Sequence, residues 1–236
     1  MKIIGIESAS LVASVAVLDE ETVIAEYTVN YKKTHSQTLL PMLDEIVRMT
    51  EQKLDEIDAI AVAGGPGSFT GLRIGAATAK GLGLALKKPL VSVPTLDAMA
   101  YSLFGSRDTI CPIMDAKRGQ VYTGLYSFGE ENHLQVIRPS EAADIRDILE
   151  EARFLGKKVI FLGDGVPVFR KVILETLGEQ AVFAPPHVSR QRAAAVAALG
   201  LELYRQGKTE TAAQHRPEYL RVSQAERERN ARLGGA

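Results

Sequence analysis

AVAGGPGSFTGLRIGAATAKGLGLAL, residues 61–86, is the most informative stretch of this chain. It begins as an apolar run, breaks at Gly-Gly-Pro-Gly and resumes with apolar residues at helical spacing, which predicts a buried strand, a loop and a helix. A loop in this position offers backbone N–H groups to an anion. It is not a Walker loop, because Leu72 and Arg73 follow Gly71 where that motif has lysine and a hydroxyl residue. Spacing alone leaves a phosphate cradle and a helix-capping turn equally open.

The helix predicted after this loop has small residues at every fourth position, namely Gly71, Gly75, Ala79 and Gly83. Residues four apart share one face of a helix. Each glycine inside a helix costs ~0.8–1.0 kcal/mol relative to alanine, so close packing against another backbone is needed to offset the cost. Two partners for this stripe stay open here: the protein's own sheet, and a helix of another chain.

The same order of elements occurs twice along the chain, on both sides of a short turn near residue 106. Strand, tight turn and strand are followed by helix, strand, glycine turn and helix, and repetition of a whole unit outweighs any single motif. The predicted strands are 2–7, 11–18, 22–30, 54–65, 89–96, 109–115, 120–128, 132–139 and 157–165. The predicted helices begin near Ser36 and Thr70 and then span 96–104, 140–154, 166–177 and 189–208.

This repeat predicts an α/β chain with two lobes, residues 1–106 and 107–236, each with a mixed sheet flanked by helices. The last helix is expected to pack back on the first lobe. A tight turn that carries an acid between two strands is the phosphate hairpin of the duplicated actin-like fold (ASKHA, ribonuclease H-like). Glu7 opens the first such turn, and Asp115 opens the second.

Composition narrows the class of protein. The chain has 236 residues, of which 46% are hydrophobic and 24% charged, as in ordinary globular proteins. The net charge of -1 argues against a nucleic-acid binder that works alone. The single cysteine, Cys111, fits a reducing cytoplasm and is expected to be a small buried side chain. Glu7 interrupts the apolar N-terminus, and no apolar run reaches the ~20 residues of a membrane span, so we expect a cytoplasmic protein.

Few residues are candidates for chemistry. His35 has Leu39 four positions later, so the helical pair of ligands that a metal site requires is incomplete, and we expect neither a metal site nor a catalytic set. Glu7 is longer than the aspartate that a phosphate hairpin usually places on a metal, which argues against ATP hydrolysis. Asp115, Lys117 and Arg118 can orient a phosphate, but turn chemistry explains them equally well. The candidates for a remnant phosphate loop are Glu7, Ser8, Ser10, Gly64, Gly65 and Gly67.

Five segments together closely resemble the TsaB (YeaZ) family, in the right order and over nearly the whole chain. They are HSQTLLPMLDEI (35–46), residues 61–86, VPTLDAMA (93–100), MDAKRGQVYTGLY (114–126) and YLRVSQAER (219–227). The resemblance implies an actin-like fold and a non-catalytic scaffold subunit for making N6-threonylcarbamoyladenosine. This modified nucleoside lies next to the anticodon of tRNAs that read codons beginning with A.

The resemblance also implies partners. TsaD, a catalytic paralogue, would carry the metal and transfer the threonylcarbamoyl group, and TsaE, a small ATPase, would join the complex. We expect a homodimer when the chain is alone, a heterodimer with TsaD, tRNA contact only through the complex, and no cofactor bound by this chain alone, with ATP and metal in partner subunits. TsaD-like chains have His-x-x-x-His where this chain has His35 and Leu39, so one ligand is gone.

The expected interface lies on the two helices that begin near Ser36 and Thr70. Its residues are His35, Leu39, Leu43, Ile46, Leu72, Gly75, Ala76, Ala79 and Gly83. Two other hypotheses stay open: an independent actin-like ATPase or phosphotransferase, and a glycoprotease-type metallopeptidase.

Overall fold

The computed structural model of the chain describes residues 1–117 and 119–220. The first lobe is built on a five-stranded sheet in which an antiparallel meander is extended by two parallel strands. The strands, in their order across the sheet, are β3 (Val23–Val29), β2 (Ala13–Asp19), β1 (Lys2–Glu7), β4 (Ala59–Gly65) and β5 (Leu90–Pro94).

The second lobe repeats this sheet strand for strand. Its order is β8 (Leu134–Asp144), β7 (Gln120–Phe128), β6 (Thr109–Asp115), β9 (Val159–Leu162) and β10 (Ala181–Phe183). The meander is again antiparallel and the last two strands are again parallel to the central one. This confirms the prediction of a duplicated actin-like fold, in which Glu7 and Asp115 end equivalent strands.

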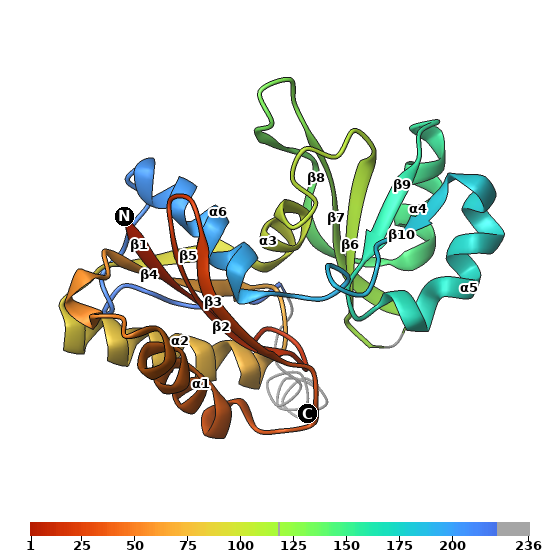
Figure 1. The fold of residues 1–236 in the computed structure, drawn as a ribbon. Coiled ribbons are helices and arrows are strands. Elements are labelled where there is room, and N and C mark those ends of the chain that lie inside the picture. Colours follow the sequence, from red (N-terminus) through yellow and green to blue (C-terminus); the bar gives the residue numbers. More distant parts are fainter. Residues whose placement is uncertain (118, 221–236) are drawn as a thin grey trace, which may run out of the picture.

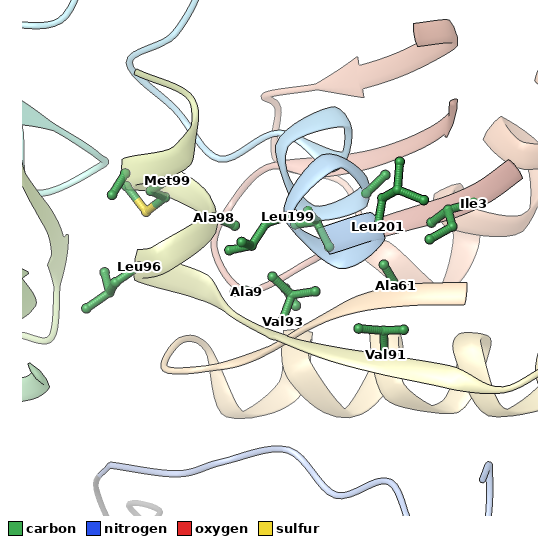
Figure 2. Close-up of a cluster of buried hydrophobic side chains, with 14 of the residues drawn as sticks. Ile3, Ala9, Ala61, Val91, Val93, Leu96, Ala98, Met99, Leu199 and Leu201 are labelled. Carbon is green, nitrogen blue, oxygen red and sulfur yellow. The ribbon is translucent and has the colours of Figure 1, made fainter. Parts of the chain in front are cut away.

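Helices cover both faces of the first sheet (Figure 1). On one face lie α1 (His35–Thr50) and α2 (Phe69–Leu86), and on the other lies α6 (Ala193–Arg205). Because side chains of a strand alternate between faces, Ile4 and Ile6 of β1 pack with α1, whereas Ile3 packs with α6. Figure 2 shows the α6 side of this core, where Leu199 and Leu201 meet Ala61 and Val93.

The last helix of each repeat packs on the other lobe. Helix α3 (Thr95–Tyr101) follows β5 but contacts the second sheet, and α6 follows β10 but covers the first. The second sheet is also covered by α4 (Ile145–Phe154) and α5 (Val166–Leu177). Two short 3₁₀ turns, Leu54–Glu56 and Gly178–Gln180, complete the elements. The division into residues 1–106 and 107–236 stays a prediction, since the exchange of helices ties the lobes together.

Three boundaries differ from the sequence predictions. Residues 140–144 were predicted to be helical, but they extend β8 alongside β7. The helix begins only after Asp144, which caps it: the Asp144 Oδ1 accepts from the Arg146 N–H at 2.9 Å. The last predicted helix is shorter at both ends, and β10 was not predicted because three residues are too few for a periodic signal. The part of the family resemblance in residues 221–227 lies outside the described residues, and so does Arg118 of the second hairpin. Within the described ranges, each helix is too short or too polar to cross a bilayer.

Candidate functional site

A cavity of about 530 Å³ lies between the two lobes, at the ends of the central strands β1 and β6. Both hairpin turns line it, the first through Ser10 and the second through Asp115 and Lys117. His35 and Asp164 add a side chain from each lobe. This is the switch point of the doubled topology, where ligands of open α/β sheets bind.

The glycine loop forms one wall of the cavity, and two N–H groups at its junction with α2 are bonded inside the protein. The Ser68 N–H donates to the Ala9 carbonyl at 2.7 Å, and the Gly71 N–H donates to Ser68 Oγ at 3.3 Å. Ser68 is therefore the N-cap of α2, and of the two readings left open by the sequence the structure favours the capping turn. Ser8 Oγ donates to the Gly71 carbonyl at 2.9 Å, which fixes the first hairpin against the start of α2.

Residues 208–220, which we name the C-terminal strap, close the other side of the loop. The Glu218 N–H donates to the Gly64 carbonyl at 2.7 Å, and a Cβ on Gly65 would overlap the Glu218 carbonyl. Of the six phosphate-loop candidates, Ser10 and Gly67 line the cavity, and Glu7 is buried behind it. The other three, Ser8, Gly64 and Gly65, make packing contacts inside the first lobe and with the strap. The sequence could not indicate the strap, because about 150 residues separate it from the loop.

The glycine stripe of α2 packs against the protein's own strands and hairpin. A Cβ on Gly75 would overlap Ser8 Oγ, and one on Gly83 would lie 2.9 Å from Leu90 Cδ2. The partner of the stripe is therefore the sheet of the same chain, and its assignment to a helix of another chain is corrected. Glycine is needed here because α2 lies closer to β1 and β4 than any larger residue permits.

Most of the predicted interface residues are likewise buried inside the chain. Leu39, Leu43, Ile46, Leu72, Ala76, Ala79, Gly75 and Gly83 are all buried within the chain. In this conformation the chain itself covers these eight residues, and their place in an interface stays a prediction. Apolar periodicity identifies the buried face of a helix, and an interface lies on the opposite face. That α1 and α2 meet a partner stays a prediction.

Carboxyl groups dominate the electrostatics of the cavity. Burial raises the pKa of Glu7 to about 7, and the charge of Asp164 adds to the effect. Burial also raises the pKa of Asp164, whose Oδ1 accepts from Gln191 Nε2 at 3.5 Å. Asp115 pairs with Lys117 Nζ at 2.6 Å, and this bond raises the pKa of Lys117. In the sequence, Asp164 was a candidate only as part of an adenosine loop at Gly163-Asp164-Gly165, and no spacing relates it to Glu7.

Histidine 35 is bonded to the main chain. Its Nε2–H donates to the Val12 carbonyl at 3.1 Å, which ties the start of α1 to the first hairpin. In residues 1–117 and 119–220, no three His, Cys, Asp or Glu side chains are placed to hold a metal ion together. Cys111 is fully buried, and burial raises the pKa of its thiol to about 12.

The actin-like fold implies a nucleotide site at this cavity, but the groups present do not fit a triphosphate. Two N–H groups that could hold phosphates, those of Ser68 and Gly71, donate to the Ala9 carbonyl and to Ser68 Oγ. The one cation of the second hairpin among the described residues, Lys117, is neutralised by Asp115, and Asp164 adds a further carboxyl to the lining. Among the described residues, the lining of the cavity therefore provides no concentration of positive charge.

Comparison with known proteins agrees with the fold. A profile of the family described as "TsaD: tRNA N6-adenosine threonylcarbamoyltransferase" matches residues 22–229. The curated TsaB of Bacillus subtilis (strain 168) is 34% identical, over 96% of each chain, and that of Escherichia coli (strain K12) is 30% identical, over 94% of this chain and 95% of its own. Among solved structures, YeaZ from Pseudomonas aeruginosa superposes with a TM-score of 0.76 at 22% identity, covering 93% of this chain and 99% of that one.

The TsaD profile covers most of the sequence, and the full-length relatives match from end to end. The chain therefore belongs to the TsaB (YeaZ) family of tRNA threonylcarbamoyladenosine biosynthesis proteins.

Proposed function

We propose that this chain is the non-catalytic subunit of the complex that forms N6-threonylcarbamoyladenosine in tRNA, and that it pairs with the catalytic paralogue TsaD. One observation carries the proposal. The position where TsaD-like chains have the second metal-binding histidine is Leu39, which is 1% exposed in the hydrophobic core, and His35 is bonded to the main chain. One of the two histidines that would hold the metal is thus replaced by a core leucine, and the other is bonded to the main chain.

The surface that we propose for pairing is the outer face of α1 and α2. Here Leu40, Met49 and Leu84 are 52%, 69% and 70% exposed, so a partner that covers them would remove apolar surface from water. Both helices lie on the same face of the sheet (Figure 1). Leu40 and Met49 are nine residues apart, which places them on opposite flanks of α1. A partner helix laid along α1 and α2 would therefore bury Leu84 together with one of these two side chains.

Gly81 supports this location. A Cβ built on Gly81 meets no atom within 4 Å, so no contact in the described part of the chain accounts for this glycine in the middle of α2. Its cost of ~0.8–1.0 kcal/mol is offset if another helix approaches closely at this point. Gly81 therefore fits a partner surface, in contrast to Gly75 and Gly83, which the sheet explains.

The partner that fits is a chain of the same fold. The TsaD profile matches residues 22–229, so the catalytic paralogue is expected to have helices equivalent to α1 and α2. Two related chains can join through equivalent faces in a pseudo-twofold arrangement, as identical chains do in an isologous dimer. The same reasoning gives a homodimer when this chain is alone, which TsaD replaces. We further propose that a TsaE ATPase joins the complex.

Leu84→Asp tests the surface. Full burial of a leucine is worth about 1.5–3 kcal/mol, so its loss should weaken association with TsaD by about 10-fold or more, measured by titration calorimetry. The matched control is Leu174→Asp, an exposed leucine on α5, which occupies the place of α2 in the second lobe. If Leu84→Asp binds TsaD as wild type does, the proposed surface is wrong.

The non-catalytic role is tested separately, by reconstituting tRNA modification from purified components. Omission of this chain should abolish modification, and its return should restore it. Mg-ATP titrated into this chain alone should give no tight binding, because Asp115 pairs with Lys117 and the carboxyl group of Asp164 also lines the cavity. Tight binding with turnover would favour an independent actin-like ATPase instead.

A further inference from the structure

A second, smaller cavity of about 320 Å³ lies between α2 and the C-terminal strap. We name it the basic groove. Its lining comes from one flank of α2 and from the strap, namely Arg73, Ala76, Ala77, Lys80, Arg216, Pro217 and Tyr219. Three of these side chains are cations and none is an acid, although the chain as a whole has a net charge of -1. Positive charge is therefore concentrated at this place.

Arg73 is held in position by aromatic rings. Its guanidinium carbon lies 3.8 Å from the centre of the Phe69 ring, and its Nε donates to the Tyr219 hydroxyl at 3.2 Å. The Phe69 and Tyr219 rings are themselves 4.8 Å apart. An arginine fixed in this way loses little side-chain freedom when an anion binds, so it is prepared for binding.

The other two cations are also without an acidic partner among the described residues. Arg216 donates to the carbonyls of Ala213 and His215, at 2.6 and 2.8 Å, which fixes its guanidinium at the mouth of the groove. Lys80 forms no ion pair with any described side chain. Cations that converge without carboxylates repel one another, and an anion between them relieves the repulsion.

The basic groove lies beside the proposed pairing surface and does not coincide with it. Ile74 and Leu82 of α2 pack with the α1 side of the core. At 100° per residue, Arg73 and Lys80 lie on the opposite flank of the helix, next to the strap. Leu84 follows Lys80 by four residues and shares its face of α2, so a partner chain that covers Leu84 would border the groove.

We propose that the basic groove binds the phosphodiester backbone of RNA, and that this chain thereby contacts tRNA within the complex. The proposal rests on the proposed function. Arginine and lysine are the usual phosphate ligands, and Tyr219, exposed at the rim, gives a face on which a base can stack. Three cations give few contacts, so the groove adds to the affinity of a larger complex and does not bind tightly alone.

The test uses the complex of this chain with TsaD and unmodified tRNA. Lys80→Glu is the variant of choice, because Lys80 has no described contact to lose. The dissociation constant is measured at about 50 and 200 mM salt, and each lost phosphate contact should reduce the ratio of the two values about threefold. The matched control is Lys157→Glu, an exposed lysine of the second lobe that should leave the ratio unchanged.

Assembly with TsaD is measured on the same samples. Normal assembly with a smaller salt dependence supports the proposal, whereas normal assembly with unchanged tRNA affinity overturns it. If Lys80→Glu prevents assembly, the groove holds an acidic side chain of the partner, and the RNA proposal is wrong. If the wild-type chain itself fails to join TsaD, the proposed function is wrong. The groove is then tested on the isolated chain, by comparing the tRNA affinity of wild type and Lys80→Glu at low salt. An equal affinity would overturn the RNA proposal.

Discussion

Replacing Glu7 by glutamine removes the carboxyl group that burial perturbs most clearly in the cleft. Glu7 is 1% exposed, and its Oε1 accepts from the Ala9 N–H at 2.6 Å. Glutamine keeps the size of the side chain and an oxygen for this bond. The variant therefore isolates the effect of charge on the free energy of unfolding.

The magnitude follows from the pKa of this carboxyl in the two states. Burial raises it from 4.5 to about 7. Below about pH 4.5 Glu7 is neutral whether the chain is folded or unfolded. Between pH 4.5 and 7 only the unfolded chain releases the proton, so the wild type loses stability as pH rises. A tenfold change in proton affinity is worth about 1.4 kcal/mol, which limits the loss to about 3 kcal/mol above pH 7.

Urea unfolding of wild type and Glu7→Gln at about pH 4.5, 5.5, 6.5 and 7.5 measures this difference. Glu7→Gln should gain stability relative to wild type across the window, by up to about 3 kcal/mol at the highest pH. Glu130→Gln, at an exposed turn, corrects for the general effect of the amide. If the difference between Glu7→Gln and wild type is the same at all four pH values, Glu7 is not held neutral by burial and the reasoning is refuted.

Gly81→Ala should raise the free energy of unfolding by about 0.8–1.0 kcal/mol, while Gly75→Ala should lower it by about 1–3 kcal/mol through overlap with the hairpin. Equal effects in urea titrations would contradict the assignment of the two faces of α2. Glu26→Gln should lower the free energy of unfolding by about 1.5–3 kcal/mol, because the Glu26 carboxylate pairs with Arg192 and accepts a hydrogen bond from the Ala194 N–H at the start of α6. An unchanged free energy of unfolding would show that the pair does not contribute to stability. At pH 8, Cys111 should react with a thiol reagent on the order of a thousandfold more slowly in the folded protein than in urea. The reason is that only the thiolate reacts and burial raises the pKa of the thiol. Rapid labelling of the folded protein would mean that the second lobe opens.

The duplicated topology was predictable because it depends on local signals. The hairpin acids Glu7 and Asp115, the glycine loop and the alternation of apolar residues each act over a few positions, and their repetition specified the two sheets. Helix α4 was predicted five residues too early, since SEAAD suits a helix in isolation and pairing with β7 extends it. Long-range pairing overrides local propensity where a strand edge is available.

The pattern of residues therefore determines the elements of this protein, their order and its family. Only the tertiary structure decides which face of each element is free. The glycine stripe of α2 meets its own strands, and the strap, more than 100 residues later in the chain, bonds to the glycine loop and forms the basic groove with α2. Spacing along a helix shows which residues share a face, but what covers that face depends on contacts between distant parts of the chain, which local periodicity does not encode.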